Sequence, residues 1–190
     1  MKNHFWLLVI SLFTLPGMMF AQNLRINEVM PTNGSALYDS NGEAEDWLEI
    51  HNPTNVAIQL SDYYISNDFS QKLMWQLPSA TISAGGFVLI FCSENDVYAP
   101  DYHSNFKLKN QTDTLGIFFK DGSTIDVFVY HEAPSDISYG CKPDGSSTLN
   151  YFESSTPDAS NNTSTGYNCV LDKPVVSMQS GFYQSPVNIA

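Results

Sequence analysis

The sequence of 190 residues predicts an all-β protein in which two antiparallel sheets pack as a sandwich. Aromatic residues make up 13% of the chain and charged residues only 15%, a composition typical of strands with a buried face. Turn-forming residues recur roughly every 8–15 positions, as expected for many short strands. Beyond the first 21 residues, no stretch keeps the periodicity of an amphipathic helix.

Two longer strands are predicted in the first part of the chain. Residues 24–30 and 47–51 alternate apolar and polar side chains, the pattern of a strand with one buried face. A turn at 31–35 and a polar, acidic loop at 39–45 lie between them. After a turn at 52–55, shorter strand candidates follow at residues 56–60, 63–66 and 73–77.

The second part of the chain adds one very apolar strand and a hairpin. Two glycines in the segment 84–86 predict a tight connector, because glycine accepts backbone angles closed to other residues. The stretch that follows, 87–92, is the most apolar strand candidate, and we expect it to be central and buried. Residues 114–119 and 124–130 predict a hairpin with an Asp-Gly turn at 121–122.

Six short motifs occur in a fixed order between residues 24 and 160. They are INEV at 26–29, DWLEIHNP at 46–53, LSDYYIS at 60–66, AGG at 84–86, HSNFKL at 103–108 and SYG at 138–140. Their order and spacing resemble the lamin tail domain, an immunoglobulin-like β-sandwich module also found in many secreted bacterial proteins. The resemblance implies a spacer or binding domain rather than a catalyst. It does not extend to the nuclear lamina, since the chain has no coiled-coil rod.

The chain divides into four segments. Residues 1–21, with a basic start, an apolar run and Ala21 before a polar stretch, are typical of a signal peptide, so we expect a secreted or cell-surface protein. The sandwich is expected at 22–153, and a Ser-, Thr- and Asn-rich linker at 154–170. Residues 171–190 resemble the truncated start of a chitobiase-type C-terminal sandwich domain, which implies a longer, multidomain protein.

The net charge of −12 argues against two classes of partner. Nucleic acid and anionic membrane surfaces both require a basic patch, and this chain has only 8 Lys and Arg against 20 Asp and Glu. No segment after the signal peptide approaches the roughly 20 apolar residues of a membrane-spanning helix. The remaining interpretations of the acidity are extracellular solubility or attraction of cations.

Three cysteines cannot all pair within one chain. Cys92 ends the apolar stretch, where a small buried thiol packs well. Cys141 and Cys169 lie among polar and turn residues, so we expect these two to pair if a disulfide forms. No Cys-x-x-Cys spacing indicates a zinc site.

The acidic loop is the one place where a cation site can be considered. Asp39, Asn41, Glu43 and Glu45 supply oxygen ligands, but an EF-hand starting at Asp39 would place Ala44 at the glycine position and Ile50 at the bidentate acid. A looser calcium cage and a solvated loop both remain open. We assign no metal-ligating residue.

No catalytic motif is present. His131-Glu132 begins like a metalloprotease motif, but Pro134 follows where a helix is required. His103 is expected to hydrogen-bond the backbone and fix its loop, as the resemblance implies. No Gly-x-Ser-x-Gly turn, phosphate-binding glycine loop or cleft around Asp46 and Glu49 is indicated, so we expect no catalytic residue and no cofactor.

Two positions of the motif DWLEIHNP are expected to have structural roles. Trp47 or Leu48, which face opposite sides of a strand, should fill the core, and Asn52 should close the following turn. Five tyrosines near predicted loops and strand ends indicate a surface for protein or carbohydrate. They are Tyr63, Tyr64, Tyr98, Tyr102 and Tyr167.

These observations predict a non-catalytic, monomeric immunoglobulin-like module. Its function is expected to be adhesion, scaffolding or targeting at the N-terminus of a larger secreted or surface protein, with an unknown protein or carbohydrate ligand. The alternative is an accessory domain of an exported enzyme, such as a hydrolase, a nuclease or a spore-coat-kinase-like protein, whose catalytic domain lies beyond residue 190.

Overall fold

The computed structural model describes residues 24–171. The predicted signal peptide (1–21) and almost all of the predicted start of a second domain (171–190) lie outside these residues. Within the described part, no helix has the length and apolar character needed to cross a bilayer.

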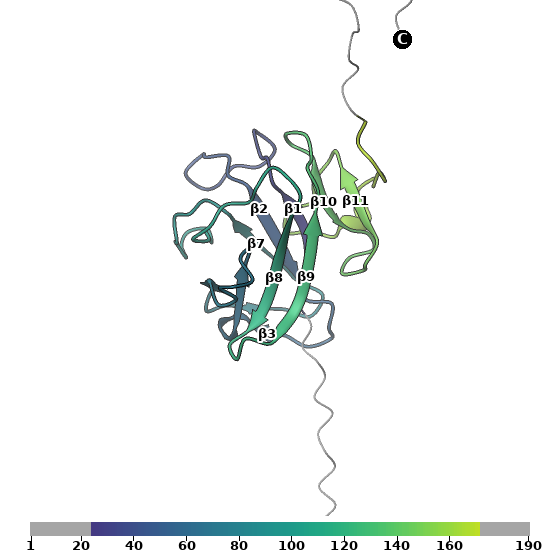
Figure 1. Cartoon of the computed structure of the whole chain (residues 1–190). Helices are drawn as coiled ribbons and strands as arrows, with labels where there is room; N and C mark the ends of the chain where they lie inside the picture. Colours follow the sequence, from purple (N-terminus) through teal and green to yellow (C-terminus); the bar gives the residue numbers. More distant parts are fainter. Residues whose placement is uncertain (1–23, 172–190) are drawn as a thin grey trace, which may run out of the picture.

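Two antiparallel sheets form a sandwich, as predicted (Figure 1). One has the strand order β11-β10-β1-β2-β7, with bounds β1 Arg25–Met30, β2 Trp47–His51, β7 Phe87–Phe91, β10 Ser138–Cys141 and β11 Leu149–Phe152. The other has the order β5-β4-β8-β9, with bounds β4 Tyr63–Ser66, β5 Trp75–Gln76, β8 Asp113–Phe119 and β9 Thr124–Tyr130. Smaller elements are β3 Ile58–Gln59, β6 Thr81–Ile82 and the 3-10 turns η1 Leu60–Asp62 and η2 Asn161–Thr163.

The main core lies between the sheets and is built from the alternating apolar positions of their strands. It includes Leu48, Ile50, Ile65, Leu115, Ile117, Phe128 and Tyr130. Trp47 faces the other way and is equally buried, in a second cluster with Met30 and Phe91 that Leu37 partly covers. The prediction that Trp47 or Leu48 fills the core is therefore confirmed, because Leu48 lies in the main core and Trp47 lies in the second cluster.

The apolar strand β7 differs from its prediction. It was expected to be central, but it lies at the edge of the five-stranded sheet, and its first three residues are only half buried. Beyond this edge, the loop around His103 partly replaces a neighbouring strand, because the amide of Phe91 donates to Tyr102 and its carbonyl accepts from Ser104. Loop cover thus makes apolar residues tolerable on an edge strand.

The hairpin of β8 and β9 is confirmed, and Gly122 in its turn has a positive φ of 82°. Strands β10 and β11 were not predicted as strands. Their residues include Gly140 and Asn150, types that are depleted in strands, so only the pairing of β10 with β1 and of β11 with β10 reveals them.

The segment 154–170, expected to be a linker, packs against the sandwich along part of its length. Asn161 is fully buried, and its Nδ2 donates to the carbonyls of Asn27 (3.0 Å) and Cys141 (2.9 Å). The polar composition indicated a linker, but Asn161 and its neighbours in this segment cover the outer face of the five-stranded sheet. The two ends of the described chain leave the sandwich at opposite ends (Figure 1).

Candidate functional site

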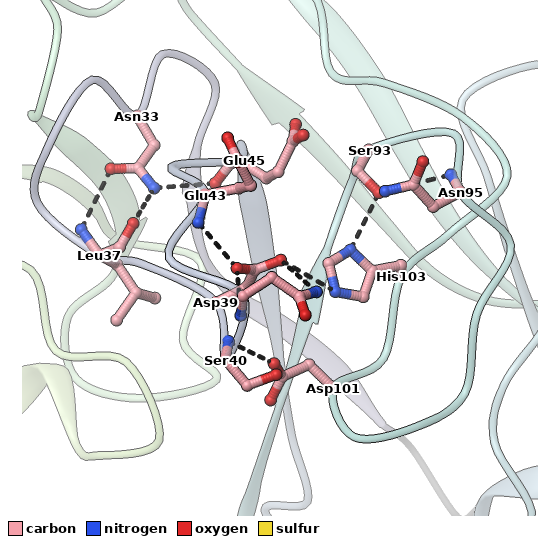
Figure 2. A network of polar contacts seen from close by, with 11 residues as sticks. Asn33, Leu37, Asp39, Ser40, Glu43, Glu45, Ser93, Asn95, Asp101 and His103 are labelled. Atoms are coloured by element: carbon pink, nitrogen blue, oxygen red, sulfur yellow. Dashed lines mark hydrogen bonds and ion pairs between the residues drawn. The ribbon is translucent and has the colours of Figure 1, made fainter.

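Figure 2 shows a polar network that joins the acidic loop to the loop after β7. The Oδ1 of Asp39 accepts from the amides of Asn41 (2.9 Å) and Glu43 (2.8 Å). Its Oδ2 lies 3.6 Å from Nε2 of His103, whose Nδ1 lies 2.9 Å from Oγ of Ser93. Burial raises the pKa of the Asp39 carboxyl, but these hydrogen bonds and His103 outweigh it, so the net pKa is lowered.

Asp39, His103 and Ser93 are the residue types of a Ser-His-Asp triad, but the two ring nitrogens are exchanged, because Nδ1 faces the serine and Nε2 faces the aspartate. The hydroxyl is also buried. Ser93 is 5% exposed and His103 is 4% exposed, too little for a substrate carbonyl to reach the hydroxyl. The network therefore holds the acidic loop and the loop after β7 together. The expectation that the His103 ring hydrogen-bonds the backbone is wrong, because its two nitrogens contact the side chains of Ser93 and Asp39.

This geometry also describes the loop considered for calcium. Asp39 is folded inward onto amides of its own loop, whereas Glu43 is exposed. Among residues 24–171, no three His, Cys, Asp or Glu side chains are grouped so that they could hold a metal ion. The acidic loop is thus shaped by its own hydrogen bonds.

A second polar cluster lies on the outer face of the five-stranded sheet, beneath the segment 154–164. Glu28 and Glu49 face each other across β1 and β2, and both are fully buried. Glu28 bonds Ser138 and accepts from the amide (3.2 Å) and hydroxyl (2.9 Å) of Thr156. Burial raises the pKa of Glu28, and burial together with nearby Glu28 raises the pKa of Glu49 to about 9 against the hydrogen bond from Asn27.

Asn27 links this acid pair to the following turn. Its Nδ2 donates to Glu49 (3.1 Å) and to Asp144 (3.2 Å), and its Oδ1 accepts from the amide of Gly145 (3.0 Å). Asp144 in turn accepts from the amide of Asn161 at 2.8 Å. All of these partners lie in the sandwich or in the segment 154–164, so the cluster holds β1, β2 and this C-terminal segment together.

The signature residue Asn52 closes its turn, as predicted. Its Nδ2 donates to the carbonyls of Val56 (2.8 Å) and Ser83 (2.9 Å), and its Oδ1 accepts from the amide of Thr54 (3.0 Å). The neighbouring His51 ring bonds the carbonyl of Gly86 at 3.0 Å and stacks on Phe87. His131 remains exposed beside Thr112. All three histidines of the described chain thus contact neighbouring residues through a ring nitrogen.

The cysteines are placed differently from their prediction. All three thiols are free, and Cys141, expected among turn residues, is buried in β10, whereas Cys169 is exposed. Burial raises the pKa of Cys141 to about 12, and burial also raises the pKa of Cys92 far above its usual range. The predicted pair of Cys141 and Cys169 is therefore absent because Cys141 points into the core.

The five tyrosines do not form one surface. Tyr63 is buried in the core, contrary to the surface role considered for it, and Tyr167 extends the sheet beside β11. Tyr98 and Tyr102 line one pocket of about 450 Å³. Its other lining residues are Ser61, Gln76, Leu77, Pro78 and Ser79. Sequence reasoning missed Gln76 and Ser79, because isolated polar residues in short strands and loops carry no pattern.

The fold and this site define an immunoglobulin-like β-sandwich module in which Glu28, Glu49, Asp39 and His103 are buried. The Lamin Tail Domain family matches residues 20–132, more than half of the chain. The chain therefore belongs to the lamin tail domain family, a generally non-catalytic immunoglobulin-like fold. No curated protein is similar enough to match it.

Proposed function

We propose that this chain is a non-catalytic binding module, used for adhesion, scaffolding or targeting, of an exported protein. The observation that carries the proposal is the contrast between reactive and aromatic groups. The reactive groups Ser93, His103, Glu28 and Glu49 are buried and bonded to the frame, whereas the Tyr98 ring is 43% exposed at a pocket. Tyrosine is enriched where proteins bind partners, because it offers a large, rigid contact area.

Export is supported by the signal-peptide pattern of residues 1–21, and the acidic charge supports a partner other than nucleic acid. The alternative, an accessory domain of an exported enzyme, draws on the pattern of residues 171–190. A catalytic domain encoded after residue 190 would favour it.

Retention on extracellular material tests the proposed function. A fluorescent fusion of the chain should remain on washed cells and secreted matrix of the producing organism. A matched Trp47→Ala fusion, which loses a buried core side chain, should wash off at a temperature at which this destabilised variant is unfolded and the native chain is folded. Equal wash-off of both fusions would contradict a binding function.

A further inference from the structure

The pocket beside Tyr98 has an aromatic floor that is fixed before any ligand arrives. The Tyr98 ring stacks on the indole of Trp75 with centroids 5.1 Å apart and planes inclined by 8°. Its hydroxyl donates to the carbonyl of Gln76 at 2.9 Å. Trp75 is itself buried and donates from Nε1 to Asp96 at 3.0 Å. One face of Tyr98 is therefore covered, and the ring presents its other face without needing to be ordered on binding.

The rim of the pocket is polar but carries no charge. The Nε2 of Gln76 donates to the carbonyl of Ser61 at 2.7 Å, which fixes the amide and leaves its oxygen to accept from a ligand. The Ser61 hydroxyl accepts from Gln59 at 3.4 Å and keeps its own proton to donate. Ser79 adds a second hydroxyl. Among residues 24–171, no Lys, Arg, Asp or Glu lines the pocket.

We propose that this pocket binds a neutral carbohydrate, with one sugar ring stacked on the open face of Tyr98. A pyranose has an apolar face of C–H groups and an equator of hydroxyls, which match a flat aromatic ring and a rim of hydroxyl and amide groups. Uronic or sialic acids and phosphorylated sugars fit poorly, because no cationic side chain of the lining would neutralise them.

This inference rests on the proposed binding function and names its ligand class. Titration calorimetry of the chain with soluble hexasaccharides of glucose, xylose, mannose and N-acetylglucosamine tests it. At least one of these neutral sugars should bind, and Tyr98→Ala should weaken binding at least about tenfold, as expected for a central aromatic contact. Tyr98→Phe, which keeps the ring, should retain most of the affinity.

Two further variants keep the test sharp. Gln76→Ala removes the amide acceptor from an exposed position and should also weaken binding, even if Tyr98→Ala disturbs the fold. Tyr167→Ala removes an equally exposed ring (48%) that is not part of the pocket lining and should leave binding unchanged.

Three outcomes would overturn the inference: no neutral sugar binds at millimolar concentration, a uronic acid oligomer or a proline-rich peptide binds in its place, or Tyr167→Ala costs as much as Tyr98→Ala. The retention assay separates this failure from failure of the proposed function. A chain retained on cells with Tyr98→Ala unchanged is still a binding module, but not through this pocket.

Discussion

Glu28 and Glu49 occupy opposed positions on β1 and β2, and both carboxyl groups are buried beneath the C-terminal segment. No Lys, Arg or His among the described residues forms an ion pair with either of them. Burial without a neighbouring cation disfavours the charged form of each carboxyl group. Both groups therefore hold their protons more strongly, and their pKa values are raised.

The acid pair should make the protein less stable as the pH rises. The pKa of Glu49 is about 9 when folded and near 4.5 when unfolded, so its stabilisation is complete below about pH 4.5 and is lost as the pH rises toward 9. The free energy of unfolding should fall by roughly 1.4 kcal/mol per pH unit in this window for one such proton. Glu49→Gln should flatten the slope in urea unfolding measured across the window. The exposed control Glu153→Gln should keep it, and identical slopes in all three proteins would refute the assignment.

Trp47→Ala should destabilise the protein by about 3–5 kcal/mol, because it empties the cluster with Met30 and Phe91. Trp47→Phe should cost less, since the indole N–H has no hydrogen-bond partner within the described chain and its loss removes only packing. Chemical denaturation measures both. A loss below about 1 kcal/mol for Trp47→Ala would mean that the ring is not a core residue.

Asn161→Ala should destabilise the sandwich by about 1–3 kcal/mol, because two buried carbonyls lose their donor. Thr165→Ala, an exposed change in the same segment, is the matched control and should be neutral. Thermal unfolding compares the two. If they behave alike, residues 154–170 do not contribute to the domain.

Cysteine labelling should reveal one reactive thiol. In the native protein, Cys169 should react with a thiol reagent, whereas Cys92 and Cys141 should react only after unfolding in urea, because burial keeps both protonated and inaccessible. Mass spectrometry counts the labels under each condition. Native labelling of Cys141, or its recovery in a disulfide with Cys169, would contradict the structure of β10.

Calcium should leave the melting temperature unchanged, because Asp39 already accepts from amides of its own loop and faces His103. A real site would add about 2.7 kcal/mol at calcium one hundred times its dissociation constant. Melting curves with millimolar calcium and with chelator make the comparison. A rise that disappears in Asp39→Ala would disprove this prediction.

The sequence predicted those parts of the fold that depend on local pattern. Alternation along β1 and β2, the Asp-Gly turn before β9 and the amide of Asn52 each act within a few residues, so they can be recognised without tertiary structure. Edge positions depend on partners far away in the chain. Strand β7 is as apolar as a central strand, and only the loop around His103 shows why it can lie at an edge.

The candidate site was less predictable for the same reason. The Asp39 network spans more than sixty residues, and Glu28 meets Thr156 across 128 positions. Tyr98 was recognised as a surface aromatic, but its stacking on Trp75 and its polar rim arise only when the loop after β7 folds over β5.

The exit of the described chain at opposite ends of the sandwich determines how the module would carry a mechanical load (Figure 1). Tension applied at Leu24 acts along β1, which is paired on both sides by β2 and β10. Inter-strand hydrogen bonds run perpendicular to the strands, so a pull along β1 loads two rows of them together rather than opening them one by one. At this end of the sandwich, β1 would therefore be released only by shearing both rows of hydrogen bonds at once.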